Sequence, residues 1–353
     1  MTKKVKIGNV YIGGGEKVAV QSMCNIKTEN AEEVAFMINA LEKLGCDIIR
    51  VSVKDVNDAK AIRKIKDEIK IPLVADIHFD YKLAIAALEN GADKIRINPG
   101  NIGLESGVKA VADALKAHKA ACRVGSNSGS VEKGFLNKYG KNEISLAESA
   151  LEKVALLEKY GFYDIVVSAK SSSVATTVKA YRYLSAKTDY PLHVGVTEAG
   201  TLQSGIIKGS AGIGSLLLDG IGDTIRYSLS APPEEEVKAG VKLLRAVGLD
   251  KNYAEVIACP TCGRTAYDCM GLAAATEDYV ANVRKPLKIA VMGCVVNGPG
   301  EASDCDLGIA GNGVNCVIFK FGKPCRQVAA INAKEEFFKE IDLLCREKSE
   351  NKV

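Results

Sequence analysis

Short runs of apolar and β-branched residues alternate with longer amphipathic segments from residue 18 to about residue 247. The runs recur at intervals of roughly 20 to 45 residues, a spacing that indicates strands alternating with helices. Eight consecutive units of this kind predict an α/β protein built on a TIM (β/α)8 barrel. The predicted strands are Val18–Ser22, Asp47–Val53, Pro72–Asp76, Lys94–Asn98, Cys122–Gly125, Asp164–Ser168, Leu192–Val196 and Asp223–Leu229.

The amphipathic segments include four with clear helical periodicity: Ala31–Leu44, Ala59–Ile69, Leu146–Tyr160 and Glu234–Val247. The alternative fold is an open, doubly wound sheet, which usually has a glycine-rich turn between its first strand and first helix. Here Gly13-Gly14-Gly15 precedes the first barrel strand instead. The barrel is therefore the preferred prediction, and residues 5–17 are predicted to form a small hairpin beneath it.

The pattern changes after Val247, where the polar segment Gly248–Asn252 is typical of a linker. We predict a barrel domain over residues 1–248 and a second, small α/β domain over residues 253–353. The second domain has predicted strands at Glu255–Ala258, Lys288–Met292 and Val317–Phe321, and predicted helices at Ala266–Arg284 and Lys334–Lys348.

Composition restricts the classes of function. The 353 residues are 47% hydrophobic and carry a net charge of only +4, which argues against a surface that binds nucleic acid or membrane. No apolar run approaches the roughly 18 residues of a membrane span, and no signal peptide is evident, so we expect a cytoplasmic protein. In a reducing compartment the 11 cysteines are not a disulfide framework; they predict a metal or cluster site together with buried thiols.

Polar residues recur at the carboxyl ends of the predicted barrel strands, where apolar side chains would otherwise fill the interior. A single cation at such a position is usually structural. Several cations that converge on one barrel mouth predict an anion site. Phosphate or diphosphate is the expected anion, because a guanidinium group binds two phosphate oxygens at once. The cations are Arg50, Arg96, Arg123, Lys170 and Arg226, and the polar residues near them include Asn98, Asn127 and Ser228.

Titratable groups accompany these cations. Glu198, Asp76 and His78 are candidates for proton transfer, although Asp76 has an alternative role in orienting a neighbour. His193 is expected to be a core histidine with its hydrogen bonds satisfied. The glycine-rich stretch 208–214 has two interpretations, a phosphate-binding loop or, with more weight, a simple turn before a helix.

Eight of the cysteines fall in the second domain, and two of them form the motif Cys259-Pro-Thr-Cys262-Gly. This spacing lets one turn present two thiolates to one metal, and on its own it favours structural zinc. A zinc ribbon needs a second Cys-x-x-Cys pair, which the sequence lacks. Further along the chain stands a single cysteine, Cys294, and a Gly-Pro-Gly turn leads from it to Glu301.

Three thiolates and one carboxylate suit a [4Fe-4S] cluster in which the oxygen ligand can be displaced by a substrate oxygen. Cys305 competes with Glu301 as the fourth ligand and would give an all-cysteine site. The remaining cysteines are predicted to be buried thiols without a role in metal binding: Cys24, Cys46, Cys122, Cys269, Cys316, Cys325 and Cys345.

Seven segments in this order resemble the family of 4-hydroxy-3-methylbut-2-enyl diphosphate synthases in its short bacterial form. They cover nearly the whole chain, and the barrel and cluster motifs agree independently. They are Gln21–Met23, Val74–Asp80, Lys94–Gly103, Val194–Gly200, Gly220–Arg226, Cys259–Arg264 and Gly293–Glu301.

The resemblance implies reductive ring opening of 2-C-methyl-D-erythritol 2,4-cyclodiphosphate, with loss of water, in the non-mevalonate route to isoprenoids. It implies that the cations hold the diphosphate with help from Asn98, Asn127 and Ser228. Glu198 would donate a proton, with Asp76 and His78 near the reacting diol. The implied cluster ligands are Cys259, Cys262, Cys294 and Glu301.

The resemblance also implies electron delivery by flavodoxin or ferredoxin, and a head-to-tail homodimer in which one subunit's cluster domain caps the partner's barrel mouth. Cys305 departs from the family pattern. The competing hypothesis is a barrel protein with a structural zinc module that binds a phosphorylated ligand without redox chemistry.

Overall fold

The computed structural model describes residues 1–98, 105–295 and 303–350. The chain divides into two compact units, Met1–Leu249 and Asp250–Val353, and each is considered by itself. None of the described helices combines the length and apolar character that a membrane span requires.

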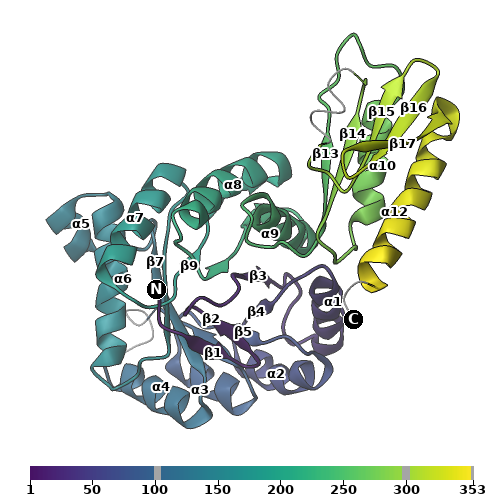
Figure 1. Ribbon diagram of the computed structural model, residues 1–353. Coiled ribbons are helices and arrows are strands. Elements are labelled where there is room, and N and C mark those ends of the chain that lie inside the picture. Colours follow the sequence, from purple (N-terminus) through teal and green to yellow (C-terminus); the bar gives the residue numbers. More distant parts are fainter. Residues whose placement is uncertain (99–104, 296–302, 351–353) are drawn as a thin grey trace. The chain divides into compact units, whose positions relative to one another are not determined.

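The first unit is a parallel barrel, as predicted (Figure 1). Its eight strands follow the spatial order β8-β7-β6-β5-β4-β3-β11-β9. A parallel bridge between Val167 on β8 and Leu192, just before β9, brings the two ends of this sheet together. The strands are β3 (Ala19–Met23), β4 (Ile48–Ser52), β5 (Leu73–Asp76), β6 (Lys94–Arg96), β7 (Ala121–Asn127), β8 (Ile165–Lys170), β9 (His193–Val194) and β11 (Thr224–Ile225).

Helices surround these strands (Figure 1). Polar caps set where two of them begin: the Asp55 carboxylate accepts from two backbone N–H groups and starts α2, and Asn142 does the same for α6. Both helices therefore begin three residues before their predicted starts. The helices are α1 (Ala31–Lys43), α2 (Val56–Glu68), α3 (Tyr81–Glu89), α4 (Glu105–His118), α5 (Lys133–Tyr139), α6 (Glu143–Glu158), α7 (Val174–Lys187), α8 (Leu202–Leu218) and α9 (Pro233–Ala246).

The amino-terminal end of the barrel is closed by the predicted hairpin. Strands β1 (Val5–Ile7) and β2 (Val10–Ile12) pair antiparallel. Their apolar side chains form a fully buried cluster with the first inward-facing residues of the barrel strands, which excludes water from this end. The cluster consists of Val5, Ile7, Ile12, Ala19, Ile48, Val74, Ala121 and Val166.

The glycine-rich stretch 208–214 lies inside α8, so neither a phosphate loop nor a turn is correct. Its glycines let the helix approach the barrel closely. A Cβ at Gly209 would lie 2.6 Å from the Tyr227 ring, and one at Gly212 would lie 2.6 Å from Val196. The predicted last strand also divides, into β11 and β12 (Leu229–Ser230), and β12 pairs with β10 (Gly200–Thr201).

The second unit is a five-stranded mixed sheet in the order β13-β14-β15-β16-β17, with α10 (Cys269–Val280) and α12 (Ala333–Glu350) packed in its main core. The sequence prediction missed β15 and β17, and α10 begins later than predicted because Asp268 caps it through the Gly271 N–H. The strands are β13 (Ala254–Ala258), β14 (Leu287–Met292), β15 (Leu307–Asn312), β16 (Asn315–Lys320) and β17 (Lys323–Ala329).

Candidate functional site

Parallel pairing sets the predicted cations side by side at the carboxyl end of the barrel. Asp76 pairs in register with Arg96, and Arg96 with Arg123, so the three side chains share the inward face. Asp76 lies between two of the arginines. Its Oδ1 accepts a hydrogen bond from Arg96 Nη1 at 3.1 Å, and its Oδ2 lies 3.7 Å from Arg50 Nε.

These side chains surround a cavity of about 150 Å³ at the barrel mouth. Every barrel residue predicted for the site lines it, apart from Asn98 and Glu198. Ser168 and Thr197 also line it and were not among the predicted site residues. The lining consists of Arg50, Asp76, His78, Arg96, Arg123, Asn127, Ser168, Lys170, Thr197, Arg226 and Ser228.

The cavity is strongly cationic. Among the described residues that line it, five are arginine or lysine, and Asp76 is the one carboxylate. Burial alone would raise the pKa of Asp76, but the charges of Arg50, Arg96 and Arg123 outweigh it and lower that pKa. Asp76 is therefore an anion at neutral pH, held in place by its arginines, rather than a proton donor.

A second carboxylate, missed from the sequence, supports the cavity from outside the strands. Glu236 on α9 is 4% exposed and accepts hydrogen bonds from Arg226, at 3.1 and 3.3 Å. It also accepts from the Ser22 hydroxyl and the Leu229 N–H. Glu236 belongs to a run of three glutamates at the start of a helix, where acidic residues are common, so nothing in the local sequence distinguishes it.

Arg123 and Lys170 have no such carboxylate. They are 3% and 6% exposed, and neither forms an ion pair within the described residues. Burial, with the neighbouring cations, lowers the pKa of both groups. A guanidinium nonetheless stays charged in a protein, so Arg123 contributes a buried positive charge that an anionic ligand can neutralise.

His78 completes the wall beside Arg96, whose Nη1 lies 3.2 Å from His78 Nε2. Because a guanidinium can only donate, Nε2 is assigned as the acceptor and Nδ1 carries the hydrogen of a neutral ring. His78 and Arg96 therefore orient each other at the cavity edge.

Glu198 lies on the loop after β9 and is exposed. Its φ of +50° is unusual for a residue other than glycine. The flanking residues fix this conformation: Thr197 N donates to Ser171 O, and Ala199 N donates to Ser228 O. Thr197 and Ser228 line the cavity, so Glu198 is held at its rim without lining it. Asn98 is buried but likewise does not line the cavity.

In the second unit, the predicted thiol ligands follow two neighbouring parallel strands. Ala258, the last residue of β13, pairs with Val291 on β14, so Cys259 and Cys294 lie just beyond the same edge of the sheet. Ala266 N donates to Gly293 O at 3.1 Å, which joins the Cys259–Cys262 loop to the Cys294 segment. The Thr261 N–H points at Cys259 Sγ, 3.4 Å away.

The structure brings these segments together without forming a closed metal site among the described residues, where no three Cys, His, Asp or Glu side chains converge on one point. Cys259 and Cys294 are half-buried and Cys262 is exposed. Glu301, the predicted oxygen ligand, lies outside the described residues. Three accessible thiols on adjoining backbone segments are a donor set that fits an iron–sulfur cluster.

Cys305 differs from these three. It is 3% exposed and packs with apolar residues that include Met292 and Phe319, and burial raises its pKa. Of the seven predicted buried thiols, five are buried and Cys345 is half-buried. The prediction is wrong for Cys325, which is exposed because it lies on the edge strand β17.

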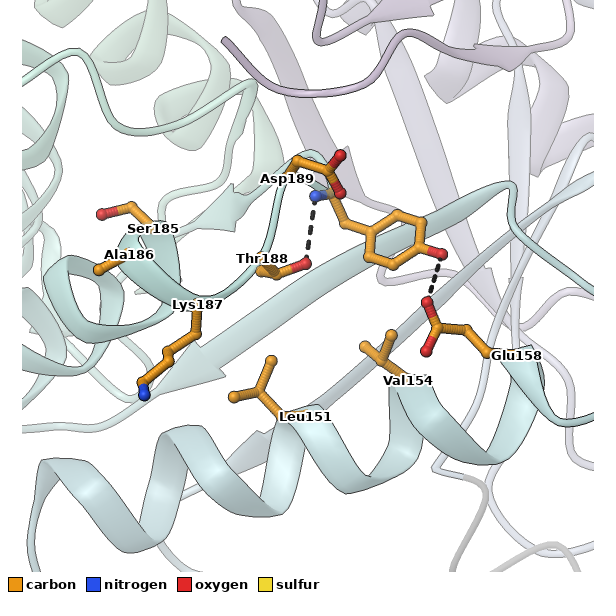
Figure 2. Close-up of a pocket in the computed structure, with 9 residues that line it drawn as sticks. Leu151, Val154, Glu158, Ser185, Ala186, Lys187, Thr188 and Asp189 are labelled. Atoms are coloured by element: carbon orange, nitrogen blue, oxygen red, sulfur yellow. Dashed lines mark hydrogen bonds between the residues drawn. The ribbon is translucent and has the colours of Figure 1, made fainter.

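A larger cavity, of about 430 Å³, lies between α6 and the last residues of α7 together with the segment that follows them (Figure 2). None of the predicted site residues lines it. Two of the lining residues are joined by a hydrogen bond, which the Tyr190 hydroxyl donates to Glu158 Oε1 at 2.8 Å. The charged side chains that line this cavity, Glu158, Lys187 and Asp189, are of both signs, whereas five cations line the cavity at the barrel mouth.

Comparison with known proteins decides the family. The GcpE TIM-barrel domain model matches residues 2–241, and the model of the GcpE C-terminal domain matches residues 255–343. The chain belongs to the GcpE family. A relative from Caldanaerobacter subterraneus subsp. tengcongensis is 55% identical over 348 residues, 98% of each chain, and one from Clostridium perfringens is 50% identical over 97% of this chain and 99% of its own. Both are named 4-hydroxy-3-methylbut-2-en-1-yl diphosphate synthase (flavodoxin).

Solved structures support the barrel of this GcpE chain at the level of fold. A dihydropteroate synthase from Stenotrophomonas maltophilia has a TM-score of 0.52 at 14% identity, over 69% of this chain and 97% of its own. A type I 3-dehydroquinate dehydratase from Clostridium difficile has a TM-score of 0.51 at 13% identity, over 70% and 98%. At sequence identities this low, the similarity is evidence for a shared fold only.

Proposed function

We propose that this protein is a 4-hydroxy-3-methylbut-2-enyl diphosphate synthase, an iron–sulfur oxidoreductase of the non-mevalonate isoprenoid pathway. It opens the ring of 2-C-methyl-D-erythritol 2,4-cyclodiphosphate reductively, consuming two electrons and releasing water. The observation that carries the proposal is the cationic cavity, in a chain that is 55% identical over nearly its whole length to a protein of that name.

Arg50, Arg96, Arg123, Lys170 and Arg226 would hold the diphosphate in this cavity. Guanidinium forks match phosphate oxygens in pairs, and each contact strengthens away from bulk water. Asn98, Asn127 and Ser228 would add neutral hydrogen bonds. Since Asp76 and Glu236 keep three of the arginines oriented before any ligand arrives, little ordering remains to be done on binding.

The loss of water needs a proton at the departing hydroxyl. Asp76 is anionic, and the neutral His78 accepts from Arg96 through Nε2, so these two groups would orient the substrate diol. Glu198 would be the proton donor, because its carboxyl group stands at the rim on a loop fixed from both sides. Its exposure is consistent with a role completed only when another element covers the mouth.

The cofactor would be a [4Fe-4S] cluster held by Cys259, Cys262, Cys294 and Glu301. When bound, it supplies electrons one at a time, delivered by flavodoxin, as the names of the relatives suggest, or by ferredoxin. A head-to-tail homodimer would bring one subunit's cluster domain to the partner's barrel mouth. We expect the enzyme to act in the cytoplasm on a small cyclic diphosphate, without nucleic acid or membrane partners.

Anaerobic purification tests the proposal. We expect a brown protein with broad visible absorption, about four irons per chain and turnover of the cyclodiphosphate with reduced flavodoxin. A colourless, active protein with one bound zinc would contradict it and favour the zinc-module hypothesis.

Two alanine variants separate the candidate fourth ligands. Glu301→Ala should abolish turnover, whereas Cys305→Ala should keep its iron and its activity, because Cys305 is part of an apolar cluster. The cost at Cys305 should be confined to stability, on the order of 1 kcal/mol. Iron content and turnover of both variants give the answer, and loss of iron in Cys305→Ala would favour an all-cysteine site.

A further inference from the structure

A lysine lies inside the barrel beneath the cationic cavity, where no ligand has been assigned to it. Lys94 on β6 is two residues before Arg96, so both side chains point into the barrel. Lys94 is 0% exposed and does not line the cavity. Its Nζ donates to Gln21 Oε1 at 3.3 Å, and within the described residues it forms no ion pair.

Among the described residues, no carboxylate without a cationic partner faces Lys94. Asp76 is already shared by Arg50 and Arg96, and Glu236 is bound to Arg226. The side chains that interact with Lys94 from the neighbouring strands are Gln21 on β3, Arg50 on β4, Arg123 on β7 and His193 on β9. The Cys122 thiol lies on the outer face of β7, and Asp76, Arg96 and Lys170 belong to the cavity lining.

In the part of the chain that the structure describes, four arginines and two lysines thus lie in or beneath the cavity, and only two carboxylates, Asp76 and Glu236 of α9, contact them. The arginines stay charged, whereas a lysine can release its proton. Burial, together with the charges of Arg123 and Arg50, lowers the pKa of Lys94 well below its usual 10.5. The same causes lower the pKa of His193, whose two ring nitrogens have no hydrogen-bond partner among the described residues. His193 is thus neutral. Because neither of its ring nitrogens has a hydrogen-bond partner among the described residues, the prediction that its hydrogen bonds are satisfied is wrong.

We propose that binding of the cyclic diphosphate in the cavity is coupled to uptake of a proton by Lys94, which is neutral in the empty barrel and becomes a buried ammonium under the bound anion. The inference deepens the proposed function and rests on it. Each phosphorus of a cyclic diphosphate carries one strongly acidic, already ionised oxygen, so the ligand itself neither gains nor loses a proton. The added proton comes from solvent and ends on Lys94 Nζ.

Lys94 is a positioning residue in this scheme. In the empty cavity a neutral Lys94 adds no further charge to the repulsion among the arginines. In the complex its positive charge attracts the bound anion from beneath the side chains that line the cavity. The site thereby adjusts its own charge to that of its ligand.

Calorimetric titration of the oxidised holoenzyme with the cyclodiphosphate tests the coupling. The titration is done anaerobically, without reductant and without phosphate, at pH 7, 8 and 9 in buffers of different ionisation enthalpy. The dependence of the observed heat on that enthalpy gives the number of protons taken up. We expect net uptake by the wild type, to which Lys170 in the cavity wall also contributes because its pKa is lowered as well. Lys94→Met should take up about 0.5 to 1 proton less than the wild type at the pH where wild-type uptake is greatest.

Lys153→Met is the matched control. Lys153 is also buried, but its Nζ has a carboxylate partner, Glu132 Oε1, at 2.9 Å. This variant should show wild-type proton uptake. Lys94→Gln replaces Lys94→Met if the methionine variant does not fold, with the same expected loss.

Equal uptake by the wild type and the Lys94 variants, or no uptake by the wild type, would overturn the coupling. If the cyclodiphosphate still binds and turns over, the proposed function survives that result. A wild-type holoenzyme that does not bind the cyclodiphosphate at all would contradict both.

Discussion

The two ends of the barrel interior are built on opposite principles. At the amino-terminal end, the β1–β2 hairpin and the first inward-facing residues of the strands form a dry apolar cluster. At the carboxyl end, positions further along the same strands carry five cations, and two of them, Arg123 and Lys170, are buried and form no ion pair within the described residues. The first arrangement gains stability from burial; the second leaves charges unneutralised until a ligand arrives. Stability and function are thus separated along each strand.

Substitution at the carboxyl end should produce the largest effect, and on function alone. Arg123→Met removes a buried cation that has no ion pair among the described residues, so we expect kcat/KM for the cyclodiphosphate to fall about 10²- to 10³-fold. The thermal midpoint should not fall, because no carboxylate loses its partner. Steady-state kinetics and thermal unfolding of the same preparation measure both effects.

Arg182→Met is the control for loss of an arginine. Arg182 is exposed and pairs with Asp219 on the outer surface, so activity should be unchanged. A clear fall in the thermal midpoint of Arg123→Met would contradict the comparison between the two ends. The carboxyl end of the barrel would then contribute to the stability of the fold as well as to function.

The opposite end should respond in the opposite way. Ile12→Ala opens a cavity in the hairpin cluster, where Ile12 is 0% exposed, and should cost about 2 to 5 kcal/mol of unfolding free energy with kcat unchanged. Denaturant unfolding measures the loss. Tyr11→Ala, on the exposed face of the same strand, should cost less than about 1 kcal/mol. A large fall in kcat for Ile12→Ala would show that the two ends are coupled.

We call Lys94, His193 and Thr224 the middle layer, because they are buried polar residues that belong neither to the apolar cluster nor to the cavity lining. Lys94 should make stability depend on pH. In the unfolded chain Lys94 is protonated at any pH below 10.5. In the folded protein it becomes protonated only when the pH falls to its lowered pKa. The penalty for burying Lys94 is therefore constant below the folded pKa, shrinks as pH rises towards 10.5, and vanishes above it. Relative to Lys94→Met, the wild type should gain up to about 1.4 kcal/mol of unfolding free energy per pH unit in that window.

Urea unfolding of both ligand-free proteins between pH 7 and 10 measures this gain. If the unfolding free energies of the two proteins change with pH in parallel, Lys94 is charged in the folded, ligand-free protein. The middle layer would then carry a positive charge like the carboxyl end of the barrel.

The sequence was sufficient for the parts of this arrangement that depend on local periodicity. Alternation along each strand identified Arg50, Arg96 and Arg123, and the same rule applied one step earlier on β6 would have identified Lys94. Glu236 could not be found in this way, because it reaches the cavity from a helix. The glycines of α8 were misread because close helix packing and a tight turn favour the same residue.

Thr224 gives the smallest and most local test of the middle layer. Its hydroxyl oxygen is buried and has no hydrogen-bond partner among the described residues, next to His193 in the β11–β9 register. An unpartnered buried hydroxyl costs free energy that an isosteric methyl group does not, so Thr224→Val should raise the unfolding free energy by about 1 kcal/mol. Activity should be unchanged, because Thr224 does not line the cavity. If Thr224→Val is instead less stable than the wild type, the Thr224 hydroxyl is hydrogen-bonded in solution. The hydrogen-bonded polar interior would then extend further towards the apolar, amino-terminal end of the barrel than the described contacts indicate.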